Sequence, residues 1–404
     1  MQILISAGEA SGDMYGAGLI EALRARVAGR VSFFGSGGER MRAAGCDIVV
    51  DAKDLAVVGI TEIVSHLPKI LGLYKKLIRA ADQRRPDLAI VIDSPAFNWR
   101  VARQMHKRGV PVVYYVCPQF WAWRQGRVKL LRKYVDKALV IFPFEEKFYR
   151  DRGVDATFVG HPLANLPGPT IAREAYAAEH DLDLAKQWIT LMPGSRRKEL
   201  RMNLPTIMEA IDRLGDKYEY LLPVAPTLDS GFLSGLIALE RRELPKVKLV
   251  PEALPALFHS RAGIIASGTA TVEAAIMGTP FVMVYRVSPL TYALGKPRVK
   301  IAHYAMVNLI ASFGGSNNDE EVVPELVQSK FTAENIVGEL EKIMADGEPR
   351  TRMIQGLAAV KAKLREGSGG QRPPEKAADI ILAMLGPKAR NPSPAKATGG
   401  RSAG

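Results

Sequence analysis

Short runs of β-branched and other apolar residues alternate with longer amphipathic stretches over most of the chain. This alternation is typical of a parallel sheet with helices on both faces, and it predicts an α/β fold. In the first half the predicted strands are Gln2–Ser6, Val31–Gly35, Leu88–Ile92, Val112–Val116, Lys137–Ile141 and Ala156–Val159. In the second half they are Trp188–Met192, Tyr218–Leu222, Val247–Val250, Ile264–Ala266 and Phe281–Tyr285.

A break in the alternation divides the chain into two parts. Proline and glycine interrupt the pattern over residues 163–170, which is typical of a linker between domains. We therefore predict two Rossmann-like domains that face a cleft, followed by helices after Thr332 that pack back on the first domain. The predicted divisions are 1–165, 171–365, a closing helix at 366–385, and a disordered basic tail at 386–404.

The composition is that of a folded, enzyme-sized chain. With 404 residues, of which 47% are hydrophobic, it can form two or three domains of about 100–200 residues each. No apolar run reaches the roughly 18 residues that span a bilayer, and no cationic leader precedes the first strand, so we expect a cytoplasmic protein. Cys46 and Cys117 match no metal spacing and are expected to be reduced core thiols.

The net charge of +13 indicates an anionic partner. Four of these charges belong to the predicted tail, which leaves +9 for the rest of the chain. An anionic lipid surface or a phosphorylated substrate accounts for such an excess. Arginine-rich stretches with interleaved aromatics would favour nucleic acid, and because the sequence has none, we predict no nucleic-acid partner.

Several common nucleotide and metal fingerprints fail in this sequence. Gly35-Ser36-Gly37-Gly38 follows the second predicted strand, and Arg40 stands where a dinucleotide motif needs its third glycine. The chain has no phosphate-loop lysine pattern, and its histidines show no metal-ligand spacing. We therefore predict no metal and no cofactor.

Two turns in the first half place polar residues at the ends of predicted strands. The turn from Gly8 to Asp13 contains Glu9 and Ser11, and Asp93 directly follows another strand. Ligands of open parallel sheets bind beyond the carboxyl ends of strands, where Asp93 can take a proton from a hydroxyl group. Helix capping by Ser11, Asp13 or Asp93 explains the same positions equally well.

Two strand–turn–helix units in the second half resemble phosphate sites. Free backbone amides and the positive end of a helix attract a phosphate, and an arginine in the first turn adds a bidentate contact. Glu273 falls about one turn into its helix, where a carboxylate can accept both hydroxyls of a ribose. Together the units predict a nucleoside diphosphate site. Its residues are Gly194, Ser195 and Arg196 in the first unit, and Ser267, Gly268, Thr269, Ala270, Thr271 and Glu273 in the second.

Two further stretches carry open alternatives. Trp121 and Trp123 follow a predicted strand beside Gln119 and Arg124, where they suit either core packing or stacking on a sugar. Apolar residues over 63–78 recur at helical spacing, for which packing on the sheet is the simpler interpretation. The other interpretation is a membrane-facing edge. Its residues are Val57, Val58, Ile60, Lys69, Lys75 and Lys76.

As a set, these stretches resemble the lipid-A-disaccharide synthases, a family of inverting glycosyltransferases with GT-B architecture. The resemblance runs in order from Met1 to about Leu385. The family usually has proline where this chain has Val307, before Asn308. The matching stretches are Gly8–Asp13, Ile92–Pro95 with Phe97-Asn98, Pro118–Arg124, Phe142–Glu145, Gly160–Pro162, Pro193–Arg196 and Ser267–Glu273.

The resemblance implies transfer of a diacylglucosamine from its UDP conjugate to diacylglucosamine 1-phosphate on the inner face of a membrane. It implies Asp93 as the base, with Glu9 beside it, and a nucleotide-sugar site that includes Ser11 and Asn308. A UDP-sugar 2-epimerase of the same fold and a non-catalytic lipid-binding protein remain alternatives. The acyl length, the identity of the sugars and the oligomeric state, a homodimer included, are left open.

Overall fold

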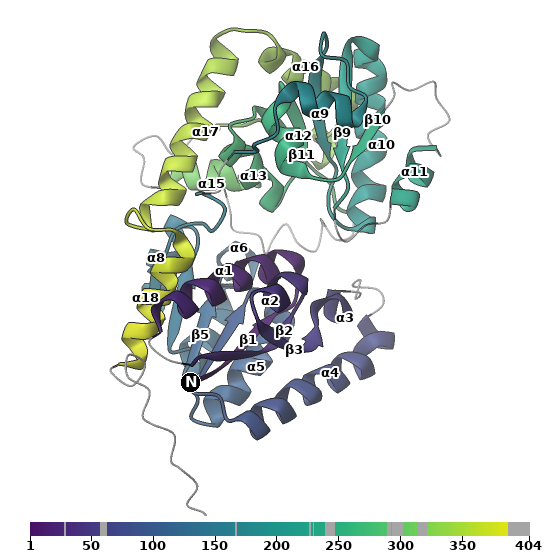
Figure 1. Ribbon diagram of the computed structural model, residues 1–404. Coiled ribbons are helices and arrows are strands. Elements are labelled where there is room, and N and C mark those ends of the chain that lie inside the picture. Colours follow the sequence, from purple (N-terminus) through teal and green to yellow (C-terminus); the bar gives the residue numbers. More distant parts are fainter. Residues whose placement is uncertain are drawn as a thin grey trace, which may run out of the picture.

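The computed structural model describes residues 1–27, 30–56, 63–165, 168–225, 228, 230–238, 247–288, 292, 302–313 and 321–386. Figure 1 shows two α/β domains, with the N-terminus in the lower one and the yellow C-terminal helices running from the upper domain to the lower. Of the predicted basic tail, only Gly386 lies among the described residues.

The first domain is built on a seven-stranded parallel sheet with the order β3-β2-β1-β4-β5-β6-β7. Alternate residues of β1 enter different apolar clusters, Ile3 and Ile5 one cluster and Leu4 the other, so the sheet is buried on both faces. The strands are β1 (Gln2–Ala7), β2 (Ser32–Gly37), β3 (Cys46–Asp51), β4 (Leu88–Ile92), β5 (Val112–Tyr115), β6 (Lys137–Val140) and β7 (Ala156–Phe158). The helices are α1 (Ala10–Arg26), α2 (Glu39–Ala43), α3 (Ala52–Ala56), α4 (Ile63–Arg84), α5 (Pro95–Lys107), α6 (Phe120–Trp123), η1 (Gln125–Arg127), α7 (Val128–Tyr134) and α8 (Pro143–Arg150).

The second domain repeats this plan with a six-stranded parallel sheet in the order β10-β9-β8-β11-β12-β13. The strands are β8 (Gln187–Met192), β9 (Tyr218–Pro223), β10 (Val247–Val250), β11 (Ala262–Ala266), β12 (Phe281–Tyr285) and β13 (Glu325–Val327). The helices are α9 (Arg173–His180), α10 (Arg197–Leu214), η2 (Gly215–Lys217), α11 (Ser230–Ala238), α12 (Ala253–His259), α13 (Thr269–Met277), α15 (Met306–Ser312), η4 (Gln328–Lys330) and α16 (Ala333–Met344).

The last two helices, α17 (Glu348–Glu366) and α18 (Pro373–Leu385), join the domains. Helix α17 packs on α13 and α15 of the second domain, whereas α18 packs on α1 of the first. Arg26 of α1 bonds Asp379 of α18 at 2.6 Å. At the crossing point, Arg365 donates to the Ala164 carbonyl at 2.8 Å.

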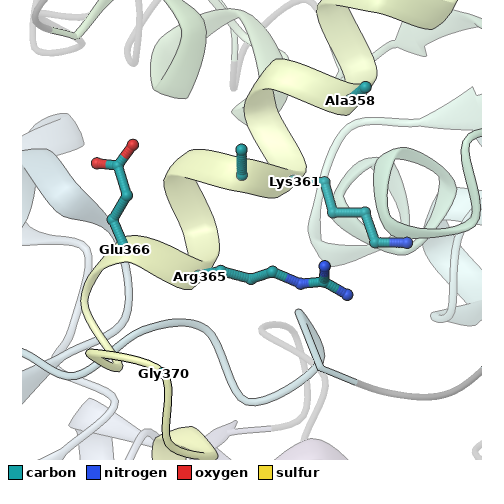
Figure 2. Close-up of a pocket in the computed structure, with 6 residues that line it drawn as sticks. Ala358, Lys361, Arg365, Glu366 and Gly370 are labelled. Carbon is teal, nitrogen blue, oxygen red and sulfur yellow. The ribbon is translucent and has the colours of Figure 1, made fainter.

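A pocket of about 550 Å³ lies on α17 at this junction (Figure 2). Lys361 and Arg365 extend to one side of the helix, and Glu366 extends to the other. The pocket is lined by Ala358, Lys361, Ala362, Arg365, Glu366 and Gly370. None of the residues predicted to form the functional site lines it.

Every strand that the sequence predicts is present, and the helical pattern after Thr332 is confirmed by α16, α17 and α18. Two strands were missed. β3 lies at one edge of the first sheet and mixes buried and exposed residues, while β13 has three residues and lies at the edge of the second. Neither strand is buried along its whole length, so the apolar pattern on which the prediction relied is weaker there than in the central strands. Cys46 and Cys117 are buried and free, as expected.

Candidate active site

The carboxyl ends of β1 and β4 lie side by side in the first sheet, where the last residues of the two strands are paired. The turns that follow them approach closely, because a Cβ atom at Gly8 would lie 2.5 Å from the hydroxyl oxygen of Ser94. Glycine is the residue that avoids this clash. The structure thereby places Glu9 and Asp93 at one edge of the sheet.

Asp93 and Ser94 form the connection between β4 and α5, here called the Asp93 turn. Both residues have positive φ, 47° for Asp93 and 45° for Ser94. This left-handed conformation is unfavourable for residues with a Cβ atom. Ser94 is the N-cap of α5 and makes no side-chain capping bond. Asp93 therefore does not cap the helix, and this alternative explanation of its position is removed.

The carboxyl group of Asp93 binds its proton more tightly than an exposed aspartate does. Burial, and to a smaller extent the negative charge of Glu9, raise its pKa to about 6, although the Ser94 N–H and the charge of Arg196 act in the opposite direction. A carboxylate that is ionised at neutral pH, yet poorly hydrated, is a stronger base than an exposed one.

Arg196 reaches from the second domain toward this edge. Its guanidinium lies 3.8 Å from Glu9 and 3.7 Å from Glu199. Since its side chain is 70% exposed, these contacts add little to stability. The arginine therefore presents its positive charge between the turn after β1 and the turn after β8.

The turn after β8 differs from the prediction of free amides. The Glu199 carboxylate accepts hydrogen bonds from the backbone N–H groups of Ser195 at 3.0 Å and Arg196 at 3.3 Å. Gly194 has φ of 129°, and a Cβ atom there would lie 2.6 Å from the Cβ of Glu199. In this structure the chain's own carboxylate therefore bonds the two amides on which the sequence analysis expected a phosphate.

The turn after β11 is open by comparison. Gly268 has φ of 144° and no atom within 4 Å of where a Cβ would lie. Ser267 donates its hydroxyl to the Tyr304 carbonyl at 2.8 Å, and Thr271 donates to the Gly268 carbonyl at 2.7 Å. These hydroxyls shape the loop, whereas Thr269 at the start of α13 is exposed. Ala270, the next residue, is half-buried.

Glu273 stands one turn further along α13. Burial raises its pKa to about 7, and its carboxylate has no hydrogen-bond partner in the described part of the chain. Tyr15 of α1 lies near it, since the charges of Glu273 and Asp93 both add to the effect of burial in raising the tyrosine's pKa. Tyr15 is not recognisable as a site residue from the sequence, because an aromatic residue on a helix has the same pattern whether it faces a core or a ligand site.

Ser11 and Asp13 follow Glu9 in α1. Ser11 is half-buried in the first turn. Asp13 accepts hydrogen bonds from the backbone N–H groups of Gly38, Arg40 and Met41 at 2.6, 3.0 and 3.1 Å. Asp13 therefore holds the start of α2 rather than α1, and its carboxylate is occupied there.

The tryptophan segment lies beyond β5. Trp121 is 7% exposed, donates its indole N–H to Glu145 at 2.9 Å and packs edge-on against Phe144. This burial favours the core alternative for Trp121. Glu145 is fully buried, which raises its pKa to about 7. Gln119 and Arg124 are exposed at the ends of α6, and the side chain of Trp123 lies outside the described part of the structure.

Asn308 is fully buried in α15, which packs against α13. Its amide nitrogen donates to the Val323 carbonyl and to Glu325, both at 2.9 Å, and its oxygen accepts from the backbone of Val322 and Val323. Because these bonds use its polar atoms within the protein, Asn308 acts as a clamp between α15 and β13 in this structure, not as the predicted ligand contact.

The predicted membrane edge is described only in part. Val57, Val58 and Ile60 lie outside the described residues. Helix α4 buries Leu77 against the sheet and exposes Leu71, Lys75 and Lys76, whereas Lys69 is paired with Asp54 at 2.7 Å. Packing on the sheet is thus confirmed for one face of the helix, and a second face carries lysines.

The described residues contain no group of three histidine, cysteine, aspartate or glutamate side chains placed to hold a metal ion. No helix within the described ranges has the length and apolar content to cross a bilayer.

Comparison with known proteins decides the family. The sequence model of the lipid-A-disaccharide synthetase family matches residues 3–380. A lipid-A-disaccharide synthase from Koribacter versatilis is 51% identical over 385 residues, which are 95% of this chain and 98% of that protein. One from Acidobacterium capsulatum is 52% identical over 373 residues, 90% and 91% of the two chains. The chain belongs to the lipid-A-disaccharide synthase family.

Solved structures show the fold that this family shares with others. The calicheamicin glycosyltransferase CalG4 superposes with a TM-score of 0.57 at 18% identity, covering 95% of this chain and 98% of that one. The UDP-GlcNAc 2-epimerase from Neisseria meningitidis, bound to UDP-GlcNAc, superposes with a TM-score of 0.58 at 12% identity, covering 95% and 99%. The architecture is therefore GT-B, as predicted, and family membership makes the chain a glycosyltransferase of lipid A biosynthesis.

Proposed function

We propose that this chain transfers a diacylglucosamine from its UDP conjugate to the 6-hydroxyl of diacylglucosamine 1-phosphate. The products are a β-1,6-linked disaccharide 1-phosphate and UDP. The observation that carries the proposal is the poorly hydrated carboxylate of Asp93 at the end of β4, beside Glu9 and within the electrostatic reach of Arg196 from the other domain.

The reaction follows from these positions. Asp93 accepts the proton of the acceptor hydroxyl while that oxygen forms a bond to the anomeric carbon. The bond between this carbon and the diphosphate oxygen breaks, and UDP leaves with the electron pair. Attack from the face opposite the leaving group inverts the anomeric configuration, which converts an α-linked donor into a β-linked product.

The nucleotide belongs to the second domain in this proposal. The open turn at Gly268 and Thr269 offers backbone amides at the start of α13, and Arg196 supplies a positive charge for the departing diphosphate. Glu273, a half-buried carboxylate without a partner in the described residues, accepts the ribose hydroxyls. Ser267 and Thr271 support this turn from within.

The acyl chains belong to the first domain in this proposal. The face of α4 with Leu71, Lys75 and Lys76 docks on an anionic membrane surface, where lysines bind headgroups and apolar side chains insert. In this proposal the exposed residues Gln119 and Arg124 contact the acceptor. The protein then works as a peripheral enzyme on the cytoplasmic face of the inner membrane.

Product analysis tests the activity. The purified protein is incubated with UDP-diacylglucosamine and diacylglucosamine 1-phosphate, and both UDP and the disaccharide are quantified. The proposal expects equal amounts of the two products and none without acceptor. An epimerase would convert the UDP-sugar without acceptor, and a lipid-binding protein would form neither product, so either result rejects the proposal.

A further inference from the structure

The Asp93 turn needs support from its surroundings. Two consecutive residues with side chains, Asp93 and Ser94, adopt positive φ. Such conformations persist only where neighbouring groups determine them, and they are frequent at catalytic sites. The groups that hold this turn therefore bear on the direction of the Asp93 carboxylate.

Asn98 of α5 is the first of these groups. Its side chain is fully buried, and its amide nitrogen lies 3.0 Å from the Ser6 carbonyl, 2.8 Å from the Ile92 carbonyl and 3.0 Å from the Asp93 carbonyl. Its oxygen accepts the Ser6 hydroxyl at 2.7 Å. One amide thus ties the ends of β1 and β4 to the turn between β4 and α5.

Tyr114 of β5 is the second group. Its hydroxyl donates to the Asp93 carbonyl at 2.7 Å, and the whole side chain is buried. The carbonyl oxygen of Asp93 therefore receives two donors, one from Asn98 and one from Tyr114. This fixes the plane of the peptide between Asp93 and Ser94, and with it the direction in which the Asp93 side chain leaves the backbone.

We propose that Asn98 and Tyr114 are positioning residues of the transfer reaction, which hold the Asp93 turn so that its carboxylate meets the acceptor hydroxyl. This inference rests on the proposed role of Asp93 as the base. A small displacement of a catalytic group lowers the rate steeply, since proton transfer requires the donor and acceptor atoms at hydrogen-bond distance. The donor nucleotide binds in the other domain, so its affinity does not depend on this turn.

The inference predicts two effects that a purely structural role would not produce. Loss of the Tyr114 hydroxyl lowers kcat while the affinity for UDP is unchanged. The acid limb of the pH–rate profile also moves to lower pH, because a carboxylate that leaves its buried position gains water and its pKa falls.

The decisive comparison is between two neighbouring tyrosines. Tyr114→Phe removes a hydroxyl bonded to the Asp93 turn, whereas Tyr115→Phe removes an equally buried hydroxyl that has no hydrogen-bond partner among the described residues. Steady-state rates with both substrates, UDP calorimetry and pH profiles are measured for each. We expect kcat to fall about tenfold in Tyr114→Phe, the size of one lost hydrogen bond, and to be unchanged in Tyr115→Phe.

Equal kcat values and equal acid limbs in the two variants overturn the inference. Asp93→Asn, measured in parallel, separates this result from failure of the proposed function, because full activity in that variant rejects Asp93 as the base whatever the tyrosines show. Asn98 is tested through Ser6→Ala, which removes one bond to its oxygen and keeps the buried amide. A severalfold loss of kcat at constant UDP affinity supports its positioning role, and an unchanged kcat contradicts it.

Discussion

The two domains carry different carboxylates near Tyr15 of α1. In the first domain, Asp93 stands on a left-handed turn whose carbonyl is bonded by Asn98 and Tyr114. In the second, Glu273 stands on the regular helix α13 and has no hydrogen-bond partner among the described residues. Burial raises the pKa of both, to about 6 and about 7. A fixed backbone suits a group that moves a proton, whereas a helical carboxylate suits one that binds hydroxyls.

A second comparison, within the second domain, shows why helix starts are poor evidence by themselves. Glu199 is the third residue of α10 and folds back onto the amides before it. Glu273 is the fifth residue of α13, too far along the helix to reach that end, so the α13 turn stays open. A carboxylate at the third helical position is a common capping residue, and it competes with any phosphate for the same amides.

The largest effect is expected for Asp93→Asn. The amide keeps the shape of the side chain but has no basic oxygen, so turnover falls by at least about a hundredfold. UDP affinity should stay near that of the unchanged protein, because the proposed nucleotide site lies in the other domain. The thermal midpoint should also change little, because the side chain keeps its shape. Rates and UDP calorimetry are measured on the same preparation. Near-normal turnover would reject Asp93 as the base. Glu9 would then be the next candidate, since the carboxylate of Asp13 already accepts hydrogen bonds from the backbone at the start of α2.

Glu273→Gln tests the opposite carboxylate. Replacing a charged acceptor of two ribose hydroxyls should weaken UDP binding about thirtyfold, which lies within the usual range for hydrogen bonds to charged groups. In the unchanged protein, UDP affinity should also fall as the pH drops through about 7, because Glu273 becomes protonated. Calorimetry across pH is the measurement, and the control is Glu209→Gln, at a half-buried glutamate of α10 that is paired with Arg213. Unaltered UDP affinity would remove Glu273 from the site.

The proposed docking of the first domain on an anionic membrane is tested on α4. Each lysine near an anionic surface contributes about 1 kcal/mol, so Lys75→Ala combined with Lys76→Ala should weaken vesicle binding at least about tenfold. Flotation with phosphatidylglycerol vesicles measures it. The matched control removes Lys217 and Lys330, two exposed lysines of the second domain. Equal losses in the two double variants would show that net charge alone, not this face of α4, governs binding.

The sequence predicts the sheet cores well and the site unevenly. The central strands β1 and β4 are continuous apolar runs, so they and the turns after them are recognisable from sequence alone. The polar groups Asn308, Asp13 and Trp121 were harder to assign. Each makes its bonds to segments distant in the chain, to β13, α2 and α8, and no local pattern shows where a side chain will find such partners. Asn98 and Tyr114 were missed as supports of the Asp93 turn for the same reason.

The smallest effect is expected from chelation. In the proposed site, Arg196 and the amides at the start of α13 supply the positive charge for the diphosphate, so UDP binding should be the same with and without EDTA. Calorimetry with UDP under both conditions measures this, and Arg196→Gln shows how much of the charge comes from the arginine. A lower affinity for UDP in the presence of EDTA would mean that the second domain binds the nucleotide through a divalent cation. The comparison would then have to be revised, because the second domain would neutralise the diphosphate with a metal ion and not only with an arginine and backbone amides.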